Sequence, residues 1–320
     1  MDDATRDLAE RPVLLTADAA GVAEAARRLR EGGLVALPTE TVYGLAARAD
    51  RDDSVAEIYR AKGRPSFNPL IVHVADVAAA RRLAVLDARA ERLAAAFWPG
   101  PLTLVLPLRA GAGLASAVTA ALPTVALRCP AHPVMRAVIA AAGVPLAGPS
   151  ANRSGGVSPT TAAHVVDSLG GRIAAVVDGG ACVAGLESTI VALRADGSWQ
   201  MLRPGPIGAD AITQVIGTSA TAVTSAAIEA PGQLASHYAP GKPVRLGALT
   251  AEADEFHIGF GAVAGAVSLS PEGDLAQAAA RLYVLLHTRT VAEQPRIAVA
   301  PIPETGIGLA INDRLRRAAA

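Results

Sequence analysis

Polar residues with ligand-binding chemistry follow several short apolar runs of this 320-residue sequence. Thr39-Glu40-Thr41 comes directly after the run 34–37, and His73 and Arg128 each close a similar run. Because α/β proteins bind ligands at the carboxyl ends of strands, these side chains are candidates for one site. A guanidinium buried there needs an anion. The sequence leaves open whether an internal carboxylate or a ligand supplies that anion to Arg128.

Two further segments carry groups that bind phosphate. Lys62 is one of only two lysines among 29 basic residues, and it stands two positions before Arg64. Together they offer a compact ammonium and a planar guanidinium to phosphate oxygens, with a solvated helix end as the alternative. Residues 148–161, rich in glycine and serine, precede an expected helix whose N-terminus favours an anion. The alternative for this segment is a flexible surface loop. We therefore expect a site for a small polyanion and a small polar molecule.

The apolar pattern predicts the elements that position these residues. Through about residue 215, short apolar runs alternate with alanine-rich helical patterns, which is typical of an α/β domain. Runs 189–193 and 199–202 flank Asp196-Gly197, a hairpin signal that indicates a mixed sheet. Ser54-Val-Ala-Glu57 predicts a capping box at the start of a helix. The predicted boundaries are residues 1–215 for the larger domain, 216–243 for a linker and 244–320 for a smaller α/β domain.

Composition excludes several classes of protein. Acidic and basic residues number 29 each and aromatic residues make up 3%, which argues against an extended nucleic-acid surface. The acidic N-terminus lacks the pattern of a signal peptide, and no stretch suits a membrane span, so we expect a cytoplasmic protein without membrane contact. Cys129 and Cys182 lie far apart without a metal-binding spacing, so no metal site is expected and both thiols should be buried.

Eight segments, in order along the chain, resemble the Sua5/YciO/YrdC family. They are PTETVYGL, KGRPSFNPLIVHV, FWPGPLTLVL, TVALRCPAHP, GPSANRSGGVSPT, GLESTI, LRPGPI and APGQLASHYAP. With its linker and smaller domain, the chain is similar to the longer Sua5 type. The resemblance implies a YrdC-like twisted mixed sheet with flanking helices, followed by a smaller Rossmann-like α/β domain.

The same resemblance implies a nucleotidyltransferase activity. Members condense L-threonine, bicarbonate or CO2, and ATP into threonylcarbamoyl-AMP and release pyrophosphate. The product serves the formation of N6-threonylcarbamoyladenosine at position 37 of tRNA. The resemblance therefore also implies Mg²⁺ held mainly by the phosphates, transfer of the product to the tRNA threonylcarbamoyl transferase machinery, and a weak contact with tRNA.

Matching the motifs residue by residue assigns roles to this chain. The implied L-threonine contacts are Thr41, His73, Arg128, the Gly148 backbone and Ser188. The implied ATP contacts are Lys62, Arg64, Asn68, Thr124, Ser150, Ser158, Arg203 and Tyr238. Lys62, Arg64 and Arg128 would act in catalysis by neutralising the reactants, and Tyr238 would fold back over the nucleotide with the linker as a lid. Gly148 stands where some members have alanine, a change that a backbone contact would survive.

Two other classes compete with this interpretation. A related domain occurs in carbamoyl transfer during hydrogenase maturation, but those enzymes carry an acylphosphatase domain and cysteine-rich zinc motifs. An RNA-binding module is the non-enzymatic alternative, and the low charge and aromatic content disfavour it. Release of pyrophosphate without RNA would separate the enzyme from the RNA-binding module.

Overall fold

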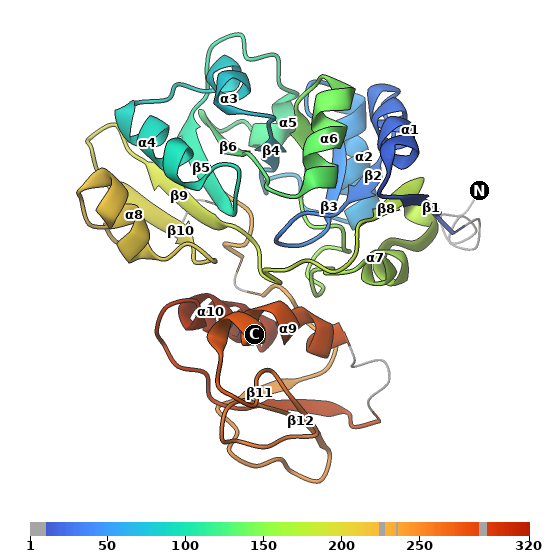
Figure 1. The fold of residues 1–320 in the computed structure, drawn as a ribbon, viewed down its shortest axis with the longest axis vertical. Helices are drawn as coiled ribbons and strands as arrows, with labels where there is room; N and C mark the ends of the chain where they lie inside the picture. Colours follow the sequence, from blue (N-terminus) through green and yellow to red (C-terminus); the bar gives the residue numbers. More distant parts are fainter. Residues whose placement is uncertain (1–10, 224–227, 235, 288–292) are drawn as a thin grey trace.

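The computed structural model describes residues 11–223, 228–234, 236–287 and 293–320. These residues form a larger domain around a ten-stranded sheet and a smaller domain around a four-stranded sheet (Figure 1). No helix in the described ranges is long and apolar enough to cross a membrane. Residues 1–10, where the sequence argues against a signal peptide, lie outside the described residues, as do positions 224–227 and 235 of the predicted linker.

The large sheet combines parallel and antiparallel strands. Its spatial order is β1-β8-β2-β3-β7-β4-β6-β5-β9-β10. The strands are β1 Val13–Thr16, β2 Val35–Leu37, β3 Gly44–Arg48, β4 Ile71–His73, β5 Leu102–Pro107, β6 Thr124–Arg128, β7 Leu146–Ala147, β8 Ala175–Asp178, β9 Thr189–Leu193 and β10 Trp199–Arg203. β4 pairs with β6 in parallel, whereas β9 and β10 form an antiparallel hairpin. The predictions of a mixed sheet and of this hairpin are therefore confirmed.

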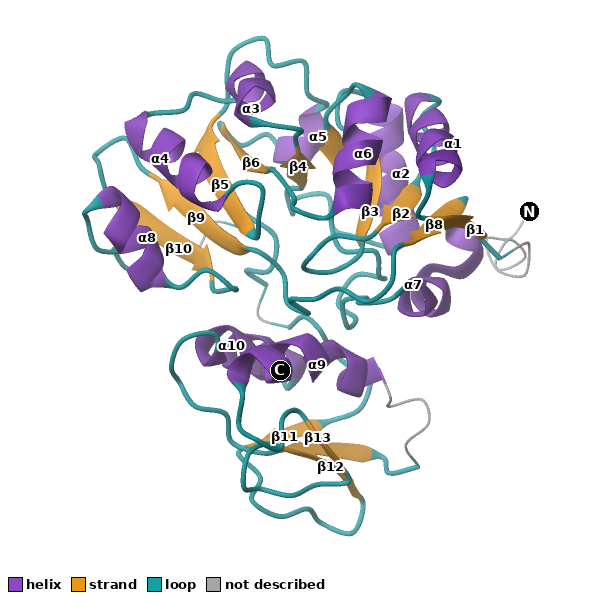
Figure 2. Ribbon diagram, viewed as in Figure 1, coloured by secondary structure: helices purple, strands orange, loops and turns teal. Residues whose placement is uncertain are grey.

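Eight α-helices belong to the described part of the larger domain (Figure 2). They are α1 Ala19–Arg30, α2 Asp52–Lys62, α3 Val77–Leu83, α4 Ala88–Phe97, α5 Ser116–Thr119, α6 Pro133–Ala142, α7 Ala162–Leu169 and α8 Ala209–Ile216. As expected, α6 begins at Pro133 and ends before Gly143, which has a φ of +71°. The predicted capping box is wrong, because α2 begins at Asp52 and Ser54 lies inside its first turn. Acidic side chains there, including Asp53, interact favourably with the helix dipole in place of a cap.

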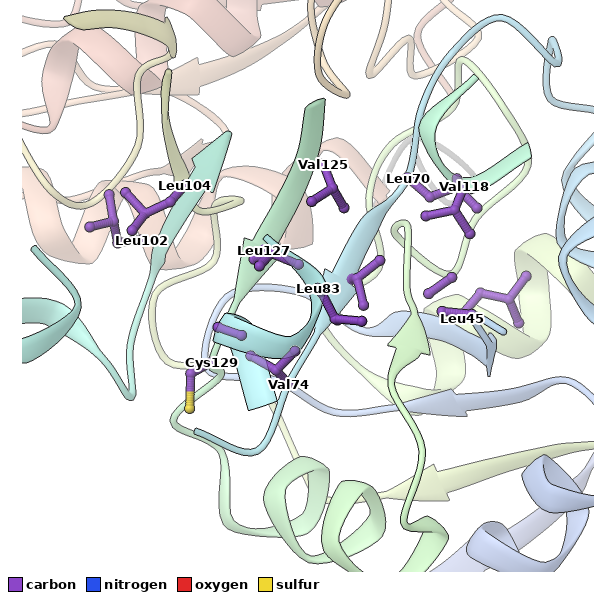
Figure 3. Close-up of a cluster of buried hydrophobic side chains, with 14 of the residues drawn as sticks. Leu45, Leu70, Val74, Leu83, Leu102, Leu104, Val118, Val125, Leu127 and Cys129 are labelled. Atoms are coloured by element: carbon purple, nitrogen blue, oxygen red, sulfur yellow. The ribbon is translucent and has the colours of Figure 1, made fainter. Parts of the chain in front are cut away.

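The main core consists mostly of aliphatic side chains, because the chain has few aromatic residues, although Tyr43, Trp98 and Trp199 are buried in it. Figure 3 shows part of it, where Leu45, Leu70, Leu102 and Leu127 from separate segments are buried together. Burial of such side chains contributes about 1.5–3 kcal/mol each. This core lies against the sheet and holds the strand ends in fixed relative positions.

The smaller domain has an entirely parallel sheet in the order β11-β14-β12-β13. Its elements are β11 Val244–Leu246, β12 Glu255–Gly259, β13 Val267–Ser268, α9 Leu275–His287, β14 Arg296–Val299 and α10 Gly308–Ala318. Helices α9 and α10 lie between this sheet and the larger domain (Figures 1 and 2). The predicted fold class, a mixed α/β domain with a smaller α/β domain, is confirmed.

Candidate functional site

The site lies where several strands of the large sheet end. His73 closes β4 and Arg128 closes β6, and the two residues are in register on these paired parallel strands. Gly148 follows β7, and its amide donates to the Ile71 carbonyl at 2.9 Å. Arg203 closes β10, next to the residue that precedes β9, Ser188. The sheet thus brings together residues that are far apart in the sequence.

These strand ends and the linker line a partly open pocket, whose empty space, open solvent included, is about 480 Å³. Nine of the thirteen predicted site residues line it, namely Thr41, Arg64, His73, Arg128, Gly148, Ser150, Ser188, Arg203 and Tyr238. The lining also includes residues to which the sequence analysis assigns no role, among them Glu187, Pro231, Gly232 and His237. Four predicted residues do not line the pocket: Lys62, Asn68, Thr124 and Ser158.

Arg128 is held by an internal carboxylate, which resolves the alternative left open by the sequence. Its Nη2 lies 2.6 Å from Oε1 of Glu40, its Nη1 donates to the Thr41 hydroxyl at 2.9 Å, and its Nε donates to the Gly100 carbonyl. Burial opposes ionisation of Glu40, but Arg128 outweighs it and keeps the pKa of that carboxyl below its usual value. These bonds use three of the five guanidinium N–H groups, and Arg128 still lines the pocket.

His73 lines the same pocket and carries a buried, unpartnered ring nitrogen. Its side chain is buried, and Nδ1 has no hydrogen-bond partner among the described residues. Burial, reinforced by Arg128, lowers the pKa of His73 to about 3. The imidazole is therefore neutral at physiological pH, and a neutral acceptor beside Arg128 suits the hydroxyl of a small ligand.

Two buried guanidinium groups of the pocket bond only to neutral acceptors among the described residues. Arg64 donates to the carbonyls of Asn68 and Pro69 at 3.2 and 3.0 Å. Arg203 donates to the Ser188 carbonyl and hydroxyl at 3.0 and 3.1 Å, and to the Pro231 carbonyl. Burial lowers the pKa of both groups, to about 10 for Arg64. A buried cation without an anion is unfavourable, so this arrangement suits an anionic ligand.

Lys62 is a third buried cation, and it holds the loop after β7. Its ammonium donates to the carbonyls of Ser150 and Asn152. Burial, followed by the nearby Arg64, lowers the pKa of Lys62 well below its usual value. The Lys62 side chain does not line the pocket. It binds the backbone of the glycine- and serine-rich loop instead.

The other three predicted residues outside the pocket lie at different distances from it. Asn68 is buried close to Arg64, and its Oδ1 has no partner among the described residues. Ser158 donates to Glu187, which does line the pocket, at 2.5 Å. Thr124 begins β6, four residues before Arg128, which places it about 13 Å along the strand. The structure therefore does not bring Thr124 into the pocket.

The linker forms one wall of the pocket. Pro231, Gly232, His237 and Tyr238 contribute to the lining, and the Tyr238 side chain is fully enclosed. Tyr238 has a φ of +63°, and the next amide, of Ala239, donates to the Gly155 carbonyl at 2.8 Å. The linker thus contacts the loop that Lys62 holds.

Sequence reasoning missed the polar network that joins the two domains behind this pocket. Glu187 lies in the segment GLESTI, where no role was assigned to it. Its position next to Ser188, an expected threonine contact, is a sequence signal that could have pointed to the site. Its carboxylate accepts hydrogen bonds from Tyr283 of α9 and Arg314 of α10 at 2.9 and 2.8 Å. No local pattern distinguishes Tyr283 or Arg314, because their partner lies about a hundred residues away.

Protein ligands for a metal ion are scarce at this site. Among the described residues, no group of three or more His, Cys, Asp or Glu side chains could hold a metal ion. Glu187 is the only carboxylate among the described residues that line the pocket, and Ser158, Tyr283 and Arg314 occupy its two oxygens. The side chains therefore do not form a binding site for a divalent cation by themselves.

Comparison with known proteins supports the resemblance in both domains. The Sua5/YciO/YrdC family model, described as "Telomere recombination", matches residues 27–205. A second model, described as "Threonylcarbamoyl-AMP synthase, C-terminal domain", matches residues 207–320. The threonylcarbamoyl-AMP synthase of Bacillus subtilis is 41% identical, with 93% of this chain and 92% of that protein covered. The Pyrococcus abyssi protein of the same name is 38% identical, with 92% of each covered.

A solved structure extends the match to three dimensions. The crystal structure of Pyrococcus abyssi Sua5 complexed with L-threonine superposes with a TM-score of 0.86 at 34% identity, covering 97% of this chain and 98% of that one. The agreement in sequence and fold includes the linker and both domains. This chain therefore belongs to the Sua5/YciO/YrdC family and is of the longer Sua5 type, with the Sua5 C-terminal domain.

Proposed function

We propose that this chain is a threonylcarbamoyl-AMP synthase that joins L-threonine, bicarbonate or CO2, and ATP. One observation carries the proposal: the buried cations Lys62, Arg64 and Arg203 bond only to neutral acceptors in the described structure, around a pocket shared with Arg128. A triphosphate supplies the missing negative charge. The names of the Bacillus and Pyrococcus relatives and the threonine complex of Pyrococcus Sua5 support the same assignment.

In this proposal, L-threonine occupies the end of the pocket near Arg128. The free N–H groups of Arg128 face the amino-acid carboxylate, with Thr41, Ser188 and the Gly148 backbone around it. The unpartnered Nδ1 of His73 accepts a hydrogen bond from the threonine hydroxyl. A site built to bond a hydroxyl discriminates strongly against analogues that lack one, because its polar atom is otherwise left unpaired.

ATP occupies the other end, between the glycine-rich loop and the linker. Arg64 and Arg203 neutralise phosphate oxygens, Ser150 lies on the loop that Lys62 holds, and the ring of Tyr238 covers the nucleotide. The predicted contacts of Asn68, Ser158 and Thr124 belong to the same hypothesis. The orphaned Asn68 oxygen suits an N–H donor, whereas Thr124 requires the ligand to reach beyond the pocket.

The reaction follows from the charges of the reactants. The threonine amine attacks CO2 and loses a proton, which gives a carbamate. A carbamate oxygen then forms a bond to the α-phosphorus while the bond from that phosphorus to the bridging oxygen breaks, and pyrophosphate leaves. Carbamate and phosphate repel each other, so positioning and charge neutralisation by Arg64, Arg128 and Arg203 supply the catalysis. The enclosed site keeps water from the mixed anhydride.

The remaining expectations extend this proposal. Mg²⁺ would be held mainly by the ATP phosphates, since the described residues that line the pocket offer no free carboxylate. The product would be passed to the tRNA threonylcarbamoyl transferase machinery for N6-threonylcarbamoyladenosine formation at position 37, with at most a weak tRNA contact. This role assigns the protein to the cytoplasm.

Incubation with ATP, Mg²⁺, bicarbonate and single amino acids tests the proposal. Mass spectrometry should detect threonylcarbamoyl-AMP with L-threonine, together with one pyrophosphate per adenylate and no requirement for RNA. Serine, which keeps the hydroxyl but lacks the methyl group, and valine, which lacks the hydroxyl, are the matched controls. Pyrophosphate release that does not depend on threonine, or that requires RNA, would contradict the proposal.

The linker makes a second test available. Tyr238→Ala should leave the fold intact but expose the adenylate to water, so that less intact adenylate is recovered per pyrophosphate released. An unchanged ratio of adenylate to pyrophosphate would mean that the linker is a tether and not a lid.

A further inference from the structure

A buried ion pair connects the C-terminal domain to the wall of the pocket. Arg314 of α10 is fully buried, and its Nε donates to Oε2 of Glu187 at 2.8 Å. Glu187 also accepts bonds from Ser158 at 2.5 Å and from Tyr283 at 2.9 Å. The carboxylate therefore has partners from both domains.

Arg314 reaches two further parts of the same wall. Its Nη2 donates to the Pro204 carbonyl at 2.9 Å, and its Cζ lies 5.3 Å from the centroid of the Tyr238 ring. That distance is within the range of a cation–π interaction. One side chain of the C-terminal domain thus contacts Glu187, Pro204 and Tyr238.

Each of these contacts fixes a group with an expected role in substrate binding. Glu187 directly precedes Ser188, an expected threonine contact, and Pro204 directly follows Arg203, an expected ATP contact. Ser188 and Arg203 also bond to each other at 3.1 Å. Tyr238 is itself the expected cover of the nucleotide. A displacement of Arg314 would therefore move groups at both ends of the pocket.

We propose that Arg314 is a positioning residue of the synthase site, through which the C-terminal domain fixes Ser188, Arg203 and Tyr238 in the geometry that binds L-threonine and ATP. This inference rests on the proposed function. It gives the C-terminal domain a role in substrate binding, although none of the described residues of that domain lines the pocket.

Electrostatics explain why this position requires a guanidinium. Burial raises the pKa of Glu187, but Arg314 and then Arg203 lower it to about 2, so the carboxylate is ionised at every physiological pH. Without Arg314, Arg203 would be the main remaining cation near Glu187, and the buried carboxylate would lose a hydrogen-bonded partner. A lysine could keep the charge, but it could not reach Glu187, Pro204 and the Tyr238 ring together.

The test is steady-state kinetics of the full-length chain with Arg314→Met, Arg314→Lys and Arg316→Met. For Arg314→Met we expect a rise of about tenfold or more in the KM for ATP and for L-threonine, corresponding to about 1.4 kcal/mol per tenfold. Arg314→Lys should be intermediate. Arg316, on the same helix, forms an exposed ion pair with Glu304 at 2.8 Å, so its variant is the matched control and should keep both KM values.

The pH dependence of activity distinguishes a role of Arg314 in positioning the substrate-binding residues from a role in holding the two domains together. In Arg314→Met, Glu187 stays buried and loses its main cation, so its pKa rises and activity should begin to fall on acidification at a higher pH than in the wild-type protein. The additional substitution Glu187→Gln should remove this limb and recover thermal stability, because both charges are then absent. It should not recover the KM values.

Three outcomes decide the inference. If Arg314→Met is folded and has wild-type KM values and the wild-type pH profile, the inference is overturned. If Arg314→Met does not fold, Arg314→Lys decides: raised KM values at a nearly wild-type melting temperature support it, and unchanged KM values overturn it. If the wild-type chain makes no threonylcarbamoyl-AMP, the proposed function itself fails, which is a different result.

Discussion

Gly148 should not tolerate an added methyl group, because its Cα lies against the His73 ring. A Cβ on Gly148 would lie 2.7 Å from Nδ1 and 2.8 Å from Cε1 of His73. Ordinary contact begins at 3.4 Å, so the imidazole must shift by about 0.7 Å. The backbone bond from Gly148 to Ile71 survives the substitution, as the sequence suggested, but the enclosed ring has little room to move.

The cost of Gly148→Ala should appear in both stability and substrate binding. Overpacking of this size costs about 1–3 kcal/mol in the free energy of unfolding. A displaced Nδ1 also loses its bond to the threonine hydroxyl, about 1–1.5 kcal/mol, so the KM for L-threonine should rise roughly five- to tenfold. Because His73 lies at the threonine end, the KM for ATP should change much less.

Thermal unfolding and initial rates of pyrophosphate release measure these effects. Gly208→Ala is the matched control, because no atom lies within 4 Å of its added Cβ and its φ of −74° suits any residue. A folded Gly148→Ala protein with an unchanged KM for L-threonine would refute the assignment of His73 to threonine recognition. Equal increases in both KM values would instead indicate a general distortion of the pocket.

The other predictions concern charge, pH and the thiols. Arg128→Ala should abolish threonine-dependent pyrophosphate release, and near-normal turnover would contradict the role of Arg128 as the carboxylate partner. Because the pKa of His73 is about 3 in the folded state and about 6.5 when unfolded, stability should be complete above about pH 6.5 and fall with acidification. For this histidine alone the loss in the free energy of unfolding is about 2 kcal/mol at pH 5. Urea unfolding at pH 7.5 and 5.0 should show a smaller difference in this free energy for His73→Gln than for the wild-type protein. An equal difference would disprove the buried neutral imidazole. Cys129 and Cys182 are both buried, and burial raises the pKa of the Cys182 thiol to about 12. A thiol reagent should therefore label the native protein slowly and the urea-unfolded protein at both cysteines. Fast labelling of the native protein would contradict this prediction.

Much of the sheet could be predicted because its strands are short and almost wholly apolar. β8, for example, has the predicted bounds Ala175–Asp178. β3 was missed because Gly44–Arg48 contains a glycine and two alanines, which lack the branched side chains typical of strands. Ser54 was misplaced as a helix cap because its spacing to Glu57 fits a capping box, while the acidic residues before it already stabilise the helix start.

The site was predictable where its residues lie at strand ends and less so where long-range pairing decides. Strand ends meet at one edge of a sheet, so His73 and Arg128 could be expected together. Local sequence could not decide that Glu40 pairs with Arg128, or that Lys62 turns toward the carbonyls of the loop. The contact of Arg314 with the site could not be predicted for the same reason, because its partner, Glu187, belongs to the other domain.

The equal numbers of acidic and basic residues conceal an uneven distribution of charge. Several exposed arginines in the described structure pair with carboxylates, as Arg27 does with Glu24 and Glu31. In contrast, Arg64 and Arg203 are buried with only neutral acceptors, so the free protein bears a desolvation cost that an anion would relieve. Net charge therefore gives no indication of phosphate binding here, whereas the burial of individual cations does. An anionic ligand stabilises such a fold when it binds.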